Sequence, residues 1–245
     1  KSVVLLPQEN TTVVSFWLRE AAAPLELILR PLVACRDFRW VSQENPTFRT
    51  RLEQGPGTLL LHPYEGLPPL ILHHTAELFE PTAYWYKQFE YTAEASTEEV
   101  YREDLYSPGQ LVCLLRPGET AQLIATTSRI PASHWGSLTA RALEHHEAPC
   151  RRARALKAGP LTTRLIQAAE QFLVKAADGA RLVLAGHPGL PVSGRDLLIA
   201  LPGLTLATGQ PEAARDLLQT MAGHCRDGLL PVRFTEEDGT PEYDS

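Results

Sequence analysis

The sequence predicts an antiparallel β-sandwich followed by the beginning of an (α/α)6 toroid. Up to about residue 130, short apolar segments with nearly alternating spacing are separated by turns rich in proline and glycine, as in a sandwich. Beyond this point the hydrophobic period lengthens. A helix that is apolar on nearly every side then precedes an amphipathic helix, the order that an inner and an outer ring require. We expect a sandwich over residues 1–130, a helical linker over 131–160 and the toroid over 161–245.

Composition and charge exclude several classes of protein. The 245 residues are 44% hydrophobic and 21% charged, which is ordinary for a globular protein, and their formal net charge is −6. Because no cluster of basic residues offers phosphate-binding charge, we expect no nucleic-acid partner. No apolar segment approaches the roughly 18 residues of a membrane helix, and no signal peptide opens the chain. We therefore expect a cytoplasmic protein without a membrane contact, and the sequence does not indicate its oligomeric state.

Cysteine and histidine usage predicts neither disulfides nor a metal site. The cysteines are far apart and form no CxxC pair, which favours reduced thiols in the cytoplasm. The histidine pairs His73-His74 and His145-His146 lack the spacing of a zinc motif such as HExxH, so we expect no metal and no cofactor. The cysteines are Cys35, Cys113, Cys150 and Cys225.

The elements of the predicted sandwich are short and mix β-branched with other apolar residues. Turns such as GPG, GLPP and RPGE separate them. The predicted strands are Thr11–Leu18, Leu25–Ala34, Gly57–Pro63, Pro69–His74, Gln110–Gly118 and Thr120–Ser128.

An aromatic cluster, YWYKQFEY, extends from Tyr84 to Tyr91 within this region, and two interpretations of it are open. Aromatic faces stack on sugar rings, so the cluster could form a carbohydrate-binding surface. Large aromatic side chains also dominate cores and interfaces, so it could instead seal the sandwich or its contact with the next domain.

The second half of the chain is expected to be helical with one short strand. We expect His134–Leu156 to form a helical linker that is broken or frayed near Pro149. A helix over Leu161–Ala176 would bury one stripe of side chains. A tight turn and a short strand follow in DGARLVLAGH, and PGLPVS is expected to be a loop. The predicted stripe consists of Leu161, Leu165, Ala168, Phe172 and Leu173.

A nearly all-apolar helix is expected over Asp196–Ala207, enclosed by other elements and bent at Pro202. Gly209 suits a C-terminal cap, and Pro211 suits the first turn of a further, two-faced helix to about Cys225. The predicted inward residues of that helix are Ala214, Leu217, Leu218 and Met221, opposite Arg215, Asp216 and Gln219.

Arg195 and Asp196 stand at the head of the apolar helix, and two interpretations of the pair are open. The Asp196 carboxylate could simply interact with free N–H groups and the positive end of the helix dipole, which stabilises by about 0.3–1 kcal/mol. A guanidinium beside a buried helix needs a partner. Arg195 could bond to a neighbouring carboxylate, or its donors could serve the hydroxyl groups of a sugar.

Stretches from both halves of the chain recur together, in one order, in a known family. They are ENTTVV, LELILRPLVACRDF, ENPTF, PYEGLPPL, WYKQFEY, REDLYSPG, AAEQFLV, AGHPG, GRDLLIALPGLTLATGQPEAARDLL, GLLPVRF and PEYDS. In these the chain resembles the prokaryotic glycogen-debranching, or amylo-α-1,6-glucosidase, proteins. The resemblance implies a β-sandwich and an (α/α)6 toroid whose cavity cleaves α-1,6-linked glucose from glycogen or another branched α-glucan. It also implies inverting hydrolysis, with a general acid and a general base about 6.5–9.5 Å apart.

The resemblance implies substrate-binding roles for Arg195, Asp196, Tyr243 and Asp244. The first two belong to the family's Gly-Arg-Asp motif at the rim of the toroid cavity. The last two match its Glu-Tyr-Asn motif, with aspartate in place of asparagine. The family's Pro-Trp-Phe-Thr-Asp-Trp loop is Pro-Gly-Leu-Pro-Val-Ser here, over residues 188–193, so stacking platforms and a hydroxyl-binding carboxylate are missing.

No catalytic acid or base is expected within this chain, because the family's catalytic residues would lie downstream of Ser245. The carboxylates of TEEDGT, residues 235–240, are expected to lie in a solvated loop. The chain opens in strand-like sequence without an initiator methionine, so we expect a fragment of a debranching enzyme. The alternative is a non-catalytic relative that holds glucan or a partner. A reading frame that continues beyond Ser245 through a full toroid with two suitable carboxylates would favour the enzyme.

Overall fold

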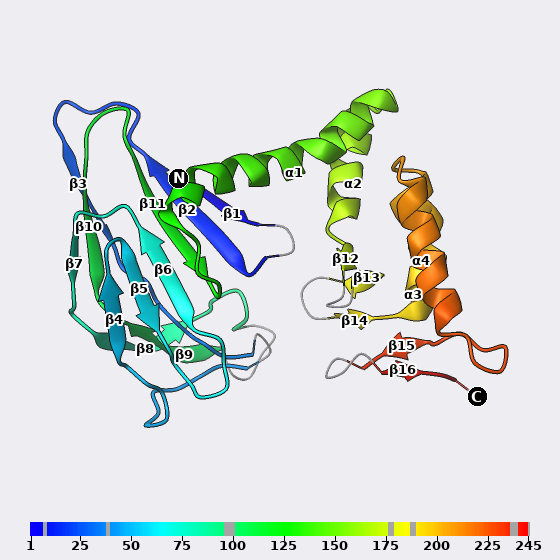
Figure 1. Cartoon of the computed structure of the whole chain (residues 1–245), viewed down its shortest axis with the longest axis horizontal. Helices are drawn as coiled ribbons and strands as arrows, with labels where there is room; N and C mark the ends of the chain where they lie inside the picture. Colours follow the sequence, from blue (N-terminus) through cyan, green and yellow to red (C-terminus); the bar gives the residue numbers. More distant parts are fainter. Residues whose placement is uncertain are drawn as a thin grey trace. The chain divides into compact units, whose positions relative to one another are not determined.

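The structure is a computed structural model that describes residues 1–6, 9–37, 40–95, 101–175, 179–186, 190–235 and 240–244. It forms two compact units, Lys1–Ala142 and Leu143–Ser245, and each unit is described by itself. An antiparallel β region makes up most of the first unit, and the second is largely helical (Figure 1).

The first unit contains a six-stranded antiparallel sheet in which strands distant in sequence lie side by side. The strand order is β1-β2-β11-β6-β5-β4 (Figure 1). Thr11 and Thr126 face each other across the β2–β11 pair, with their buried hydroxyl oxygens 2.8 Å apart. The strands are β1 (Ser2–Leu5), β2 (Thr11–Trp17), β11 (Thr120–Thr126), β6 (Leu70–His74), β5 (Thr58–Leu61) and β4 (Leu52–Gly55).

A three-stranded antiparallel sheet packs against the first sheet and closes the core. It consists of β3 (Leu25–Leu29), β10 (Gln110–Leu115) and β7 (Leu78–Glu80), in that order. Strands of both sheets contribute to the core, so the predicted antiparallel sandwich and its six predicted strands are confirmed. The prediction missed β4 and β7, and also the later strands Tyr84–Glu90 and Arg102–Ser107. The core consists of Leu29, Leu59, Leu72, Leu111, Cys113, Leu115 and Ala121.

An antiparallel ribbon of β8 (Tyr84–Glu90) and β9 (Arg102–Ser107) carries the aromatic cluster. Trp85 points into a second core, where its ring centroid lies 4.9 Å from that of Phe48. Tyr84, one residue earlier in the strand, is 62% exposed. Because successive side chains of a strand point to opposite faces, the cluster both seals the sandwich and presents aromatic rings to solvent.

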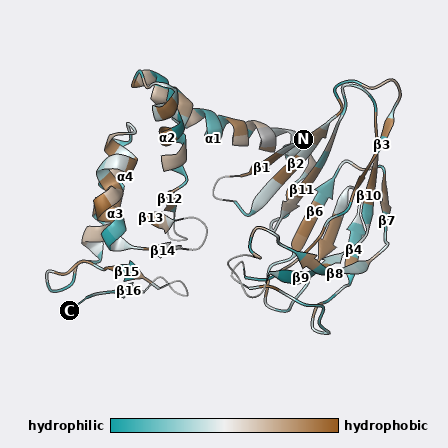
Figure 2. Ribbon diagram, turned by 180° about the vertical axis from the view of Figure 1, so that it is seen from behind, coloured by the Kyte–Doolittle hydropathy of each residue, from teal (hydrophilic) through white to brown (hydrophobic). Residues whose placement is uncertain are grey.

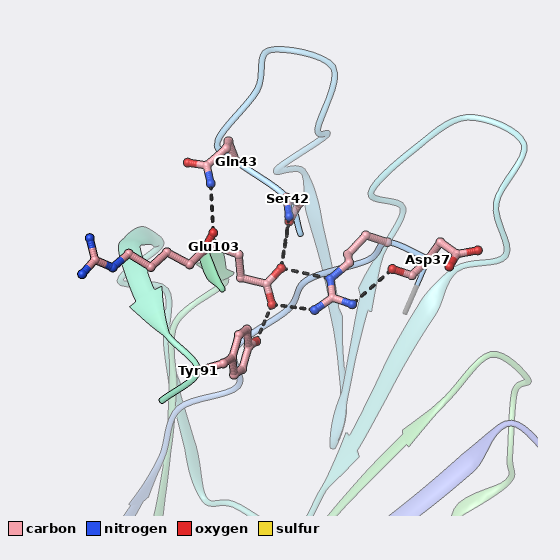
Figure 3. Close-up of polar contacts among 7 residues, drawn as sticks. Asp37, Ser42, Gln43, Tyr91 and Glu103 are labelled. Carbon is pink, nitrogen blue, oxygen red and sulfur yellow. Dashed lines mark hydrogen bonds and ion pairs between the residues drawn. The ribbon is translucent and has the colours of Figure 1, made fainter. Parts of the chain in front are cut away.

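A buried glutamate anchors the connection between β3 and β4 to this ribbon (Figure 3). The Glu103 side chain is 0% exposed, and its carboxylate accepts two hydrogen bonds from Arg36, at 2.9 and 3.0 Å. It also accepts bonds from the Tyr91 hydroxyl and, at 3.2 Å, from the Ser42 N–H. Burial raises the pKa of Glu103, but the hydrogen bonds from Arg36, Tyr91 and Ser42 and the Arg36 charge outweigh it and hold the pKa below its usual value.

Helix α1 (Trp135–Ala155) begins in the first unit and ends in the second. The helix continues through Pro149, so the predicted break there is wrong. Proline lacks an N–H and deprives the carbonyl four residues earlier of its partner. That carbonyl belongs to the exposed His145, where water can replace the lost hydrogen bond. Residues of α1 pack on the sandwich in a cluster of Leu6, Val13, Ile124, Leu138 and Ala142.

The second unit combines short helices with a small antiparallel sheet of order β12-β13-β14 and a hairpin, β15–β16. Helix α4 carries both hydrophobic and hydrophilic stretches, as a helix with one buried face should (Figure 2). The elements are α2 (Pro160–Glu170), β12 (Leu173–Lys175), β13 (Arg181–Gly186), β14 (Leu190–Val192), α3 (Gly194–Leu201), α4 (Pro211–Gly223), β15 (Arg233–Phe234) and β16 (Pro241–Glu242). The core consists of Val183, Leu197, Leu201, Ala214, Leu217, Met221 and Phe234.

Two predictions for the start of this unit are wrong. The helix predicted to reach Ala176 ends at Glu170, because the following Leu-Val-Lys segment pairs with β13 as strand β12. The predicted stripe has the wrong phase: Leu161 and Leu165 are 72% and 60% exposed, and Ile166 and Ala169 are buried instead. The predicted strand in DGARLVLAGH is confirmed as β13, whereas the expected PGLPVS loop contains β14.

The apolar helix begins two residues earlier than predicted and changes its winding at Pro202. An α-helix ends at Leu201, and a π-helical segment, Pro202–Leu206, follows. Its wider turn is closed by the Ala207 N–H, which donates to the Pro202 carbonyl at 3.0 Å. The predicted enclosure of this helix is wrong on one face, because Ile199 and Leu206 are 69% and 54% exposed.

The caps around the next helix follow the prediction. Gly209, at a φ of 76°, lies in the left-handed region that favours glycine. Its N–H donates to the Leu206 carbonyl, and the Gln210 N–H donates to the Thr205 carbonyl at 2.8 Å. Pro211 then opens α4 as predicted. Of the predicted inward residues Ala214, Leu217 and Met221 are buried, whereas Leu218 is 49% exposed and that part of the prediction is wrong.

Candidate functional site

The N-terminus of α3 is held by hydrogen bonds from its first backbone groups. Ser193 Oγ accepts from the Asp196 N–H at 3.1 Å, so Ser193 is the capping residue. The N–H groups of Gly194 and Arg195 both donate to the Val232 carbonyl, at 2.8 and 3.3 Å. Because these N–H groups have partners within the protein, they are not free to bind an anionic ligand.

The side chains of Arg195 and Asp196 are both exposed. Within the part of the chain that the structure describes, neither forms a side-chain hydrogen bond or an ion pair. An exposed guanidinium stays hydrated, so Arg195 does not need the partner that a buried one requires. The assignment of both residues to a sugar-binding cavity rim stays a prediction.

The two motifs assigned by resemblance lie on neighbouring backbone segments. Ser193 forms a β-bridge with Arg233, and Arg233 pairs with Glu242 in the β15–β16 hairpin. The Val232 N–H donates to the Glu242 carbonyl at 2.8 Å, while the Val232 carbonyl receives the two N–H groups of α3. Val232 therefore joins the start of α3 to the strand that precedes Tyr243. Val232 and Arg233 belong to the stretch GLLPVRF, but no spacing in the sequence predicts this linking role for them.

Tyr243 and Asp244 differ in what their side chains offer a ligand. Tyr243 is half-buried, and its O–H donates to the His224 carbonyl at 2.7 Å, which ties the hairpin to the end of α4. The Arg226 guanidinium lies 5.7 Å from the Tyr243 ring centroid. Asp244 is exposed, and its charge contributes, after the hydrogen bond and charge of Glu242, to raising the pKa of Arg233. Asp244 is thus the more accessible of the two.

Gly194 sets the closest approach between α3 and the segment before β15. A Cβ atom at this position would lie 2.1 Å from the Pro231 carbonyl oxygen and 2.9 Å from Met221 Cε. Packing therefore requires glycine at this position. The close approach that it permits lets the Arg195 N–H donate to the Val232 carbonyl. The first residue of the Gly-Arg-Asp motif has a structural task, and the next two project outward.

The arrangement can hydrogen-bond hydroxyl groups from several sides. Arg195 supplies fixed donors, and Asp196 and Asp244 supply acceptors. All three side chains are exposed on segments whose backbones are linked through Val232. Such a set suits an uncharged, hydroxyl-rich ligand. The carboxylates of TEEDGT at residues 236–238 lie outside the described residues.

The perturbed carboxylate of the first unit, Glu103, is not a catalytic candidate. A shifted pKa can mark an active site, but ion-pair networks shift pKa values as well. Both carboxylate oxygens of Glu103 accept from Arg36, and the remaining directions are taken by Tyr91 and Ser42. A carboxylate with all its acceptor positions occupied cannot also take a proton from a substrate or water. The network holds the fold.

Within the described ranges no three histidine, cysteine, aspartate or glutamate side chains lie together as metal ligands would. None of the helices formed by the described residues combines the length and apolarity needed to cross a membrane.

Two family models match the chain. Residues 1–122 match the model described as glycogen debranching enzyme N terminal, and residues 167–245 match the model described as amylo-alpha-1,6-glucosidase. The first match covers the strands from β1 into β11, and the second begins within α2 and includes every residue of the candidate site. Searches of curated proteins and of solved structures found no match.

Proposed function

Because this chain belongs to the glycogen-debranching, amylo-α-1,6-glucosidase family, we propose that it serves the hydrolysis of α-1,6-linked glucose branches in glycogen-type glucans. Its own part is to bind glucan, through the exposed side chains of Arg195, Asp196 and Asp244 and the ring of Tyr243. The proposal assigns no catalytic acid or base to this chain. It also assigns the protein to the cytoplasm, which its four free cysteines favour.

One observation carries the proposal: both sugar-site motifs meet at Val232. Ser193 and Val232 are 39 positions apart in the chain, yet backbone hydrogen bonds bring their two segments together. Inverting hydrolysis needs an acid and a base on opposite sides of the sugar, about 6.5–9.5 Å apart. The side chains of Asp196 and Asp244 are exposed to water, whereas a catalytic pair acts in a site that excludes water. Binding is therefore the role that their surroundings support.

A second candidate function, glucan binding by a non-catalytic relative, is favoured by the segment ahead of Gly194. The family's tryptophans and aspartate are absent from it. Residues 188 and 189 lie outside the described residues. Of the rest, Val192 packs against the core of the second unit and Ser193 caps α3. These residues serve packing and capping, whereas tryptophans would have offered platforms to a sugar.

The proposal is tested by incubating the 245-residue chain with an α-1,6-branched limit dextrin and measuring both glucose release and binding. We expect retardation of the chain in affinity electrophoresis and no glucose release. An active debranching enzyme is the positive control. Steady glucose release that is abolished by Asp196→Asn would contradict the assignment and make Asp196 catalytic, and absence of any binding would contradict the glucan-binding role.

A further inference from the structure

The outer face of the three-stranded sheet in the first unit carries an ordered row of polar side chains that the proposed function does not use. Arg30 donates to the Tyr86 hydroxyl and to Gln110 Oε1. Gln110 Nε2 donates in turn to Glu80 Oε2 at 2.5 Å. The row crosses β3, β10 and β7, so its members come from three distant parts of the sequence. Each side chain is held by its neighbour before any ligand arrives.

Next to this polar row lies an apolar row on the same face. Val112 pairs with Ile28 on one side and with Leu78 on the other. Ile28 and Leu78 are 49% and 51% exposed, because the inward-facing residues of these strands fill the sandwich core instead. Residues i and i+2 of a strand project to one face about 7 Å apart. The two rows therefore run side by side across the sheet.

Two tyrosines stand beside the Arg30 end of the polar row. Tyr84 and Tyr86 share one face of β8, opposite the half-buried Trp85, and their ring centroids are 5.4 Å apart at an interplanar angle of 84°. Tyr84 is 62% exposed. The Arg30 guanidinium lies 5.7 Å from the Tyr86 ring centroid. Aromatic surface and hydrogen-bonding groups thus meet at one place.

We propose that this face, formed by Arg30, Gln110, Glu80, Tyr84, Tyr86 and the adjacent apolar row, binds a linear α-1,4-glucan segment. This proposal rests on the proposed function, because it assumes that the protein's ligand is a glycogen-type glucan and assigns a second surface to it. A glucose ring has an apolar C–H face and a rim of hydroxyl groups that both donate and accept. The polar row offers donors from Arg30 and Gln110 and an acceptor at Glu80, while the tyrosine rings and the apolar row meet the C–H faces.

A protein partner fits this face less well than a polysaccharide. A stable protein interface buries about 1,200–2,000 Å² and has a core depleted of charge. Here the apolar part is one row of three side chains with Leu114 beyond it, and the charged groups of Arg30 and Glu80 stand directly beside that row. Preordered polar groups also lower the entropy lost when a flexible sugar chain binds.

The test is the affinity of the 245-residue chain for maltoheptaose, which contains no α-1,6 branch, measured by calorimetric titration. We expect Tyr84→Ala to weaken binding roughly fivefold and Arg30→Ala to weaken it at least as much. Trp17→Ala is the matched control, since Trp17 is 56% exposed and lies in the other sheet. It should bind maltoheptaose as the unchanged chain does.

The outcomes separate this inference from the proposed function. If Tyr84→Ala binds maltoheptaose normally, or Trp17→Ala weakens binding equally, the inference is wrong while branched-dextrin binding through Arg195 can stand. If the unchanged chain binds neither maltoheptaose nor branched dextrin, both are wrong. A concentration-dependent dimer that is lost in Tyr84→Ala, without maltoheptaose binding, would identify the face as a contact between copies and overturn the inference.

Discussion

In the first unit a motif carboxylate is buried and held by its neighbours, whereas in the second unit the charged residues of the Gly-Arg-Asp motif are exposed. Glu103, from REDLYSPG, is fully enclosed by Arg36, Tyr91 and Ser42. Arg195 and Asp196, from the Gly-Arg-Asp motif, project to solvent from a helix start whose backbone is satisfied elsewhere. A residue of a family motif can thus be enclosed within the fold or left exposed, and for the exposed pair we propose ligand binding.

The largest expected effect is the loss of stability when the Glu103 network is broken. Glu103→Ala leaves the half-buried Arg36 guanidinium without its two charge-assisted bonds, which should lower the free energy of unfolding by about 3 kcal/mol. Urea denaturation measures this loss in the free energy of unfolding. Glu65→Ala is the control, because the Arg49–Glu65 ion pair is exposed and should contribute less than about 1 kcal/mol. Equal effects of the two substitutions would show that burial does not decide the role of the network.

The same network should make the sandwich sensitive to acid. The folded pKa of Glu103 lies below its usual value of 4.5, so the unfolded chain takes up the proton first as the pH falls. The stabilisation from the ionised carboxylate is complete above that value and is lost as the pH falls through the folded pKa. In Glu103→Gln the slope of unfolding free energy against pH should decrease by up to about 1.4 kcal/mol per pH unit in this range. An unchanged slope would mean that the pKa of Glu103 is the same in the folded and the unfolded chain, and would contradict the lowering by the network.

A smaller loss is expected at Gly194, where the motif of the second unit meets the fold. Gly194→Ala should destabilise this unit by about 1–3 kcal/mol, because the added Cβ requires the Pro231 carbonyl to move. Gly203 is a matched control: a Cβ there meets nothing within 4 Å, so Gly203→Ala should be neutral or slightly stabilising. Amide hydrogen exchange in α4 and β13 reports the difference. Similar protection in both variants would contradict the close-packing role.

The smallest effects on stability are expected where the motif residues are exposed. Arg195→Ala should change the unfolding free energy by less than about 0.5 kcal/mol. Asp196→Asn should lower it by at most about 1 kcal/mol, through the lost interaction with the α3 dipole. Thermal unfolding of both variants measures this. A loss as large as that of Glu103→Ala would show that the pair holds the fold.

The sequence predicted the sandwich strands well because alternation leaves only one face for the core. In α2, however, two stripes satisfy a helical period, one through Leu161 and Leu165 and one through Ile166 and Ala169, and only tertiary contacts choose between them. The Glu103 network escaped prediction because Ser42 and Arg36 lie 61 and 67 residues from Glu103 in the chain, and no periodicity encodes such a pairing. At the candidate site, the sequence could have predicted the start of α3. Ser193 stands three residues before Asp196, which is the spacing of an N-cap residue and its partner.

The central claim, that exposure of Arg195 reflects ligand binding, is tested most directly by the affinity of Arg195→Ala for a short oligosaccharide that carries one α-1,6-linked glucose. The measurement is a calorimetric titration of the 245-residue chain, with Tyr84→Ala introduced in both proteins so that binding at the face of Arg30, Gln110 and Tyr84 is weakened equally in the two. We expect a roughly tenfold weaker affinity, because a charged hydrogen-bond donor is lost, with an unchanged unfolding temperature. Unchanged affinity in a stably folded Arg195→Ala protein would contradict the claim.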